Sequence, residues 1–407
     1  MKNHRLPLRT SLLATGSVIG IACAGVLSAV PANAATTISF EKGVLKVVGD
    51  AGNNSFTVGR TPAGVITLNG APVVGGAATV SNVSVVHLEG GAGNDTLRFD
   101  EANGPMPRGE FLGGDGRDAF RGGSAADTLI GGAGIDRGTG GPGDDTVSLG
   151  ADADEFTWNV GDGNDHVDAD AGADALLFNG NDGADSVIVA GAAGGRATVG
   201  SHAVPFGTVD FAGFEQLKVN AAGGADNVEV DDLAGTGLGQ VRIGLDAATS
   251  SSSSGDNDDE VSVLLGDDSE KVRAVGSLAA GLTVAGTPVP VLISGADKLT
   301  IAGGVGDDVI DASRLAAGAA GQLVLFGYSN RGPVSHGHDT LIGSPGDDLM
   351  FSFDDGGDRM EGRGGNDHLV GSPDSDQLFG GDGDDFLSGL GGNDVLDGGA
   401  GNNVIIP

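Results

Sequence analysis

A nine-residue step in the last quarter of the chain limits what this sequence can fold into. Glycine pairs alternate with aspartates, and one extra residue precedes Asp358. The aspartates are Asp339, Asp348, Asp358, Asp367, Asp376, Asp385 and Asp394, and Asn403 takes the same place in the final unit. The residue two positions later is apolar in every unit: Leu341, Met350, Met360, Leu369, Leu378, Leu387, Leu396 and Ile405. A flexible linker has no interior for such a column to face, so the pattern predicts stacked short strands.

A second array with the same step lies upstream. Its aspartates are Asp118, Asp127, Asp136, Asp145 and Asp154, followed after two-residue insertions by Asp165, Asp174 and Asp185. Single copies surround Asp95 and Asp308, and degenerate copies surround Asp226 and Asp259. The repeat therefore recurs over much of the chain, which favours one long repeat architecture.

The spacing has a physical explanation. Six residues of the form G-G-x-G-x-D make a turn, because glycine reaches positive φ without a Cβ clash. Such a turn directs backbone carbonyls inward, and the aspartate adds a carboxylate, so the oxygens suit a hard cation such as Ca²⁺. The remaining residues form a short strand whose apolar side chain points inward. Two units make one coil, and coils stacked about 4.8 Å apart place alternate turns above one another.

The full unit, G-G-x-G-x-D-x-U-x with U a large apolar residue, resembles the haemolysin-type calcium-binding repeat of the RTX family. The resemblance implies an all-β fold, a right-handed parallel β-roll or β-helix solenoid with several Ca²⁺ ions between its turns. The residues expected to bind metal are Asp95, Asp118, Asp127, Asp136, Asp145, Asp308, Asp339, Asp348, Asp358, Asp367, Asp376, Asp385 and Asp394, together with Gly113, Gly131, Gly362, Gly380 and Gly398.

We divide the chain at these arrays. Residues 35–112 form an N-terminal β-rich segment, 113–189 the first array, 190–302 a middle β-rich segment and 303–407 the second array. Short β-prone runs broken by Gly, Asn and Pro fill both β-rich segments. They either continue the solenoid with broader coils or form small β-sandwich-like pieces beside it, and the sequence does not separate these alternatives.

Residues 1–34 read as a secretory signal peptide. Lys2, Arg5 and Arg9 form a basic start, residues 11–30 are largely apolar, and residues 31–34 (PANA) offer a small-residue cleavage site. Cleavage would leave 18 basic against 56 acidic residues, a net charge of −38, and no cysteine. Such a surface repels nucleic acid and anionic membranes. We expect a secreted protein that metal rather than disulfides stabilises, exported through the general secretory route with no membrane insertion in its mature form.

No catalytic motif stands out. The sequence has no HExxH, GxSxG or P-loop motif. A polysaccharide lyase site usually combines basic residues with tyrosine or histidine, and this chain has one tyrosine and few basic residues. Abundant carboxylates nevertheless leave a hidden carboxylate pair undetectable. We therefore expect a non-catalytic calcium-binding protein with a structural or surface role, whose partners include extracellular polysaccharide or a cell surface. The alternative is a calcium-dependent polysaccharide-active enzyme on a β-helix.

Overall fold

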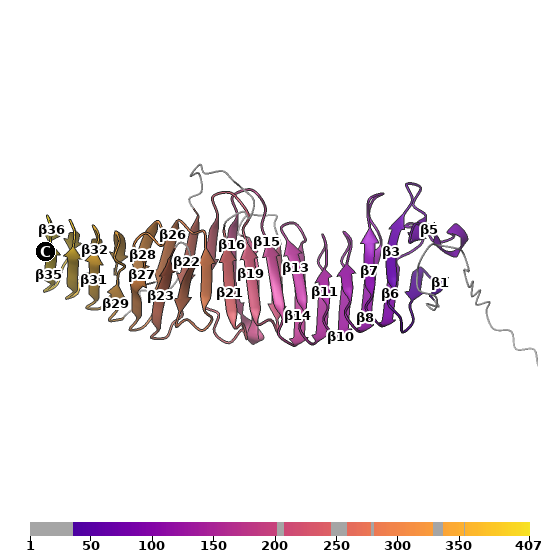
Figure 1. The fold of residues 1–407 in the computed structure, drawn as a ribbon, viewed down its shortest axis with the longest axis horizontal. Coiled ribbons are helices and arrows are strands. Elements are labelled where there is room, and N and C mark those ends of the chain that lie inside the picture. The colour runs from indigo at the N-terminus through magenta and orange to yellow at the C-terminus, as the bar shows by residue number, and fades with distance from the viewer. Residues whose placement is uncertain (1–35, 202–206, 246–258, 278–280, 329–336, 354) are drawn as a thin grey trace, which may run out of the picture.

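The computed structural model describes residues 36–201, 207–245, 259–277, 281–328, 337–353 and 355–407. The predicted signal peptide lies outside these residues. Strands dominate the chain and two short 3-10 turns, η1 (Val73–Gly76) and η2 (Ala193–Gly195), are its helical elements in the described part. Figure 1 shows an elongated stack of short strands that runs from β1 at one end to β35 and β36 at the other. No helix among the described residues is long and apolar enough to span a bilayer.

The strands form two ladders that face each other along the stack. We call the first ladder sheet A. In order of pairing it contains β1 (Thr37–Glu41), β2 (Val44–Val48), β6 (Val85–Ala92), β8 (Arg108–Asp115), β10 (Thr128–Ala133), β12 (Thr146–Ala151), β14 (Asn164–Ala171), β18 (Thr208–Ala212), β17 (Arg196–Ser201), β16 (Ser186–Ala192), β20 (Asn227–Val230), β22 (Glu260–Leu264), β26 (Lys298–Ala302), β28 (Gln322–Phe326), β30 (Asp348–Phe351), β32 (His368–Val370), β34 (Phe386–Ser388) and β36 (Val404–Ile406).

The second ladder is sheet B. In order of pairing it contains β5 (Ala71–Pro72), β4 (Ile66–Leu68), β3 (Ser55–Arg60), β7 (Thr96–Asp100), β9 (Ala119–Arg121), β11 (Arg137–Thr139), β13 (Glu155–Asn159), β15 (Ala175–Asn179), β19 (Gln216–Asn220), β21 (Gln240–Gly244), β25 (Val291–Ser294), β24 (Gly281–Ala285), β23 (Lys271–Ser277), β27 (Val309–Leu315), β29 (Thr340–Ile342), β31 (Arg359–Gly364), β33 (Gln377–Asp382) and β35 (Val395–Ala400).

Within the arrays the chain alternates between the two sheets, one strand in each per coil. Neighbouring strands of a sheet are parallel and pair residues 18 positions apart, as Leu129 of β10 pairs with Val147 of β12. In the second array Leu378 of β33 pairs with Leu396 of β35 in the same way. These registers confirm the predicted coil of two nonapeptides and the β-roll solenoid.

Both β-rich segments lie in the same two ladders. Antiparallel strands interrupt the parallel order at three places: the β1–β2 hairpin with the β3–β4–β5 meander, the β16–β17–β18 meander in sheet A and the β23–β24–β25 meander in sheet B. The two alternatives that the sequence left open are therefore resolved in favour of a continuous solenoid with inserted strands. The exact domain boundaries remain a prediction.

The interior between the sheets is a single apolar column. Of the eight predicted inward residues of the second array, six are fully buried: Leu341, Met350, Met360, Leu369, Leu378 and Leu387. Leu396 is only partly buried, and Ile405 keeps 44% of its surface exposed. The prediction that Ile405 is interior is wrong, because β36 ends the ladder and no described strand covers it. In the first array Trp158 is fully buried and stacks on Phe178 with ring centroids 4.8 Å apart.

Candidate metal-binding turns

The repeat turns lie at the edges of the two sheets, immediately before the strands. In most of them the second and fourth residues adopt positive φ, as at Gly114 (+114°) and Gly116 (+137°). A Cβ on Gly114 would lie 1.8 Å from the carbonyl oxygen of Gly91 in the preceding coil. Glycine is needed here both for the backbone conformation and for the close approach of neighbouring coils.

Most repeat turns begin with a glycine, and this first glycine has a different role. Gly113 does not have positive φ, but a Cβ on it would lie 2.3 Å from Asp118 Oδ2 and 2.6 Å from the carbonyl oxygen of Gly131. Three other first glycines, Gly131, Gly362 and Gly380, face the same pair of groups: their own aspartate and a carbonyl of the next coil. The absent side chain leaves a slot in which a carboxylate oxygen and a backbone oxygen converge. At Gly398 the Asn403 side chain takes the place of the aspartate.

The aspartates stack in two columns, one before each sheet. The Asp118 N–H donates to Asp136 Oδ1 at 2.8 Å, and the Asp136 N–H donates to Asp154 Oδ1 at 2.7 Å, all before strands of sheet B. On the sheet A side, the Asp127 N–H donates to Asp145 Oδ1 at 2.7 Å. The second array repeats this ladder in both columns. One carboxylate oxygen of each aspartate therefore joins successive coils.

The other carboxylate oxygen is frequently left without a protein partner. It is buried and receives no hydrogen bond at Asp95, Asp118, Asp136, Asp145, Asp154, Asp165, Asp174, Asp226, Asp367 and Asp385. These ten residues are at most 3% exposed. A buried carboxylate oxygen without a donor is costly. In the turns of Asp95, Asp118, Asp136, Asp145, Asp367 and Asp385 this oxygen lies in a glycine slot, which fits a hard cation. The turns of Asp154, Asp165, Asp174 and Asp226 begin with Leu149, Val160, Ala169 and Ala221 instead of glycine. Across the described residues no three His, Cys, Asp or Glu side chains gather into a metal cluster, so an ion in a turn would depend on backbone carbonyls.

Asn54 shows that the turn carbonyls accept an electropositive group. It stands in the aspartate place of residues 49–54, and Asp95 Oδ1 accepts its N–H at 2.6 Å. Its amide Nδ2 donates to the carbonyl oxygens of Asp50 and Gly90, both at 3.3 Å, and to that of Gly52. Three backbone carbonyls from two coils thus meet at one donor. In this turn an amide nitrogen fills the slot that the aspartate turns leave open.

Burial raises the pKa of several repeat carboxylates. Desolvation is the largest cause at Asp145, Asp367 and Asp136, and the charges of stacked aspartates add to it. The pKa reaches about 8 at Asp145 and Asp367, about 7 at Asp136 and Asp165, and about 6 at Asp118. With no cation beside them, many of these groups hold a proton near neutral pH.

The structure brings most predicted metal residues into these two columns. Asp308, Asp339, Asp358 and Asp376 continue the sheet B column, while Asp348, Asp367 and Asp385 form the sheet A column of the second array. Asp394 lies in the sheet B column but is only half-buried. The predicted metal residues do not include six members of the columns, which are Asp154, Asp165, Asp174, Asp185, Asp226 and Asp259. The first four belong to the first array and could have been found from its step and insertions, whereas Asp226 and Asp259 lie in the degenerate copies.

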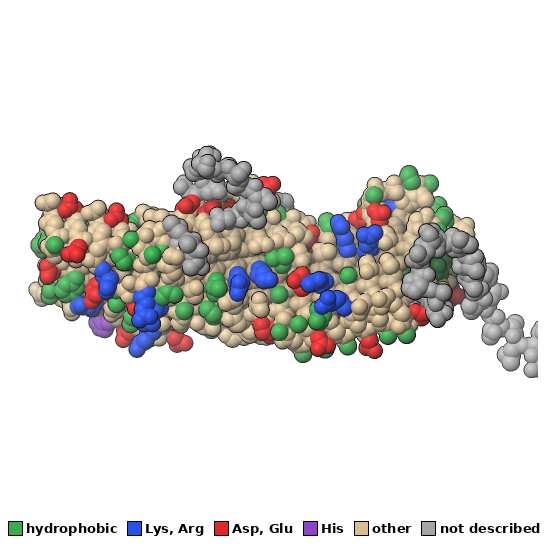
Figure 2. All heavy atoms as spheres, in the orientation of Figure 1, with side chains coloured by type: hydrophobic (Ala, Val, Ile, Leu, Met, Phe, Trp, Pro, Cys, Tyr) green, Lys and Arg blue, Asp and Glu red, His purple; other side chains and the backbone are tan. Residues whose placement is uncertain are grey.

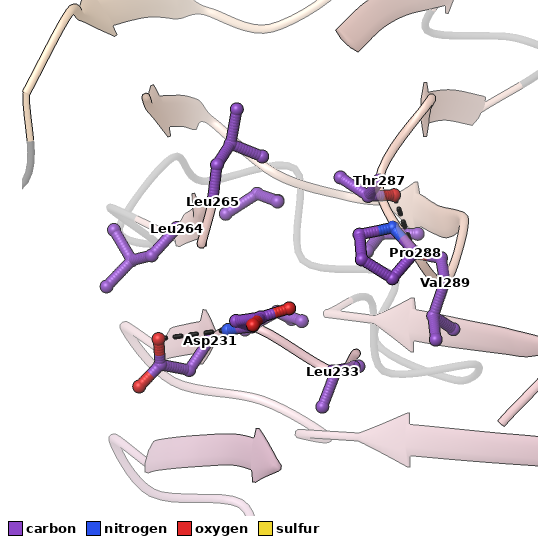
Figure 3. Close-up of a pocket in the computed structure, with 11 residues that line it drawn as sticks. Asp231, Leu233, Leu264, Leu265, Thr287, Pro288 and Val289 are labelled. Atoms are coloured by element: carbon purple, nitrogen blue, oxygen red, sulfur yellow. Dashed lines mark hydrogen bonds between the residues drawn. The ribbon is translucent and has the colours of Figure 1, made fainter. Parts of the chain in front are cut away.

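Two hollows elsewhere offer little for chemistry. Figure 3 shows one between Leu233, Leu265 and Val289, with about 10 Å³ of space, room for no more than one water. Asp231 and Asp232 are the titratable side chains among its lining residues. The other, of about 250 Å³, lies between Leu323 and the turn of Asp348, and its titratable lining residues are Asp347 and Asp348. Neither hollow is lined by a histidine, tyrosine or basic side chain.

Comparison with known proteins agrees with this geometry. The model of a family described as RTX calcium-binding nonapeptide repeat (4 copies) matches residues 87–103, 111–138, 130–157, 336–352, 354–387 and 370–405. No curated protein matches the chain. The matched segments hold most of the stacked turns of both arrays. With their nine-residue step, glycine slots and aspartate columns, these segments are RTX calcium-binding nonapeptide repeats.

Proposed function

We propose that this protein binds several Ca²⁺ ions in its repeat turns and that the metal completes the fold after export. The observation that carries the proposal is the set of ten buried Oδ2 atoms without a hydrogen-bond donor, six of which face a glycine slot. Bound Ca²⁺ would supply positive charge to those oxygens and link neighbouring coils. The aspartates hold the coils in register through Oδ1, and the glycines keep the slots free of side-chain atoms.

The distribution of charge supports the same proposal. The chain carries 56 acidic residues against 21 basic ones, yet acidic side chains are only scattered over the face shown in Figure 2. Many of the carboxylates lie inside the columns instead. Their mutual repulsion opposes folding unless a cation or a proton neutralises them. Extracellular modules typically bind Ca²⁺ in the range of about 10⁻⁴–10⁻³ M, so the arrays would stay loose inside a cell and become ordered outside it.

We further propose that the protein is non-catalytic and has a structural or surface role in the extracellular matrix. The hollows described above lack the basic and aromatic groups of a lyase-type site, which favours this role over the enzyme alternative. Incubation with acidic polysaccharides in the presence of calcium should release neither reducing ends nor unsaturated products. Turnover in that assay would restore the enzyme alternative, while calcium-dependent retention on polymer or cells would support the matrix role.

The proposal is tested by far-UV circular dichroism of the purified protein during a calcium titration from a chelated start, with magnesium as the control. We expect a cooperative gain of β signal with calcium and little change with magnesium, because Mg²⁺ demands a smaller octahedral site and dehydrates reluctantly. A spectrum that is already fully β in chelator and unmoved by calcium would refute metal-completed folding.

A further inference from the structure

The repeat turns are of two kinds, although both belong to the same columns. In ten of them, which we call open turns, the second residue has positive φ and the aspartate Oδ2 lacks a donor. They end at Asp95, Asp118, Asp136, Asp145, Asp154, Asp165, Asp174, Asp226, Asp367 and Asp385. In four others, which we call closed turns, the second residue does not have positive φ. They end at Asp127, Asp185, Asp348 and Asp376.

In the closed turns a backbone N–H of the same turn donates a hydrogen bond to the aspartate Oδ2. The N–H of Gly123 donates to Asp127 Oδ2 at 2.6 Å, four residues away. The equivalent N–H, from Asn181, Ser344 or Ser372, donates to Oδ2 in the other three closed turns, at 2.8, 2.6 and 2.6 Å. In these turns the N–H hydrogen points at the oxygen that the open turns leave free. A cation and an N–H hydrogen are both electropositive, so they exclude each other from the same slot.

Several open turns keep their shape without glycine. Asp170, Ala222 and Arg363 occupy the second position at φ of +67°, +73° and +82°, a region that is unfavourable for residues with a Cβ. Closing the turn would relieve this strain and give Oδ2 a donor. Three residues with different side chains keep this strained conformation. We take this as an indication that the open conformation has a function in these turns.

Asn403 shows where the second carbonyl of an open turn points. Its turn has the open conformation, with φ of +73° at Gly399, and its amide Nδ2 donates to the Gly399 carbonyl oxygen at 3.3 Å. The carbonyl of the second residue therefore faces the aspartate position. In the open turn of Asp118 the next-coil carbonyl of Gly131 also lies beside the slot at Gly113 that Oδ2 faces, so backbone oxygens from two coils surround the free Oδ2.

We infer that calcium binding is confined to the open turns and that the closed turns are metal-independent steps of the same columns. This inference rests on the proposed function and deepens it. It places ions at Asp165, Asp174 and Asp226, which lie outside the segments that match the repeat family. It withholds them from Asp127, Asp348 and Asp376, which lie inside those segments and which the sequence alone marks as ligands.

The test compares Asp136→Asn with Asp127→Asn in the full protein. The two residues belong to adjacent turns of one array, are at most 2% exposed, and each accepts an N–H through Oδ1. Native mass spectrometry counts the bound calcium ions, and thermal unfolding is followed with calcium and with chelator. Asp136→Asn should bind one ion fewer and lower Tm only with calcium. Asp127→Asn should keep every ion and lower Tm equally in both conditions.

A second pair, Asp367→Asn in an open turn and Asp348→Asn in a closed turn, repeats the comparison in the other array, so one variant that fails to fold does not decide the result. Loss of an ion from Asp127→Asn or Asp348→Asn would overturn the division into two classes. Wild-type protein that binds no calcium would instead refute the proposed function, so the two failures are distinguishable.

Discussion

At the scale of single residues, the amide of Asn54 stands where the aspartate turns would hold a cation. Replacing it by aspartate removes the Nδ2 donor and leaves a carboxylate among the carbonyls of Asp50, Gly52 and Gly90. Asp50, the second residue of this turn, does not have positive φ, so the turn is not open and we expect Asn54→Asp to bind as many calcium ions as wild type, counted by native mass spectrometry. In chelator the Tm of this variant should fall, because the new carboxylate is buried among carbonyl oxygens with no donor or cation beside it. An additional bound ion would show that positive φ at the second residue is not required for calcium binding.

The turn glycines allow a matched pair of substitutions. Gly114 has φ of +114° and approaches the Gly91 carbonyl, whereas Gly161 has φ of +102° with nothing within 4 Å of an added Cβ. Gly161→Ala should lower the free energy of unfolding by about 1 kcal/mol, the cost of placing a residue with a Cβ at positive φ. Gly114→Ala should cost about 2–4 kcal/mol, because overpacking between coils adds to that cost. Urea unfolding in saturating calcium measures both, and equal losses would show that coil contact does not require glycine at Gly114.

At the scale of one strand, the apolar column stabilises each coil by burial. Leu378 of β33 is fully buried, whereas Ile405 of β36 occupies the equivalent place and is 44% exposed. Leu378→Ala should therefore lower the free energy of unfolding by about 2–5 kcal/mol, and Ile405→Ala by much less. Thermal or urea unfolding with calcium present gives the comparison. Similar losses at both positions would mean that another surface covers β36 in solution.

The same strands show how far sequence reasoning reaches. The step from Asp367 to Asp385 predicts the coil length, the burial of Leu369 and Leu387, and the stacked carboxylates, because each depends only on a fixed local period. The β16–β17–β18 meander depends instead on pairing between distant strands, such as β14 with β18, and no period marks it. Local pattern also does not separate open from closed turns, since Gly123 and Gly132 both follow a first glycine yet differ in backbone conformation.

At the scale of the whole molecule, stability without calcium should fall as pH rises, and the stabilisation by calcium should increase. Folding raises the pKa of buried aspartates from 3.8 to values between about 6 and about 8. A raised pKa means that the folded state without metal binds protons more tightly than the unfolded chain. Its contribution to stability is complete below about pH 4 and is lost as pH rises through 6 to 8.

In chelator we therefore expect Tm to fall between pH 5 and pH 8. Calcium should restore it most strongly at pH 8, because the carboxylates are then free of protons and available to the metal. Thermal scans at several pH values, with calcium and with chelator, measure both trends. A calcium-free Tm that rises with pH would contradict the assigned cause, because the sign would then require carboxylates stabilised in their charged form.

Trp158, which stacks on Phe178, provides an intrinsic fluorescence probe of folding. The chain contains one tryptophan and one tyrosine. Trp158 lies in the core of the first array between the turns of Asp154 and Asp165, whereas Tyr328 packs against Phe326 beside the second array. Excitation at the red edge selects the indole alone, so its emission follows the ordering of one half of the solenoid while circular dichroism follows both. Comparing the two signals would show in unlabelled protein whether the halves become ordered together or in sequence.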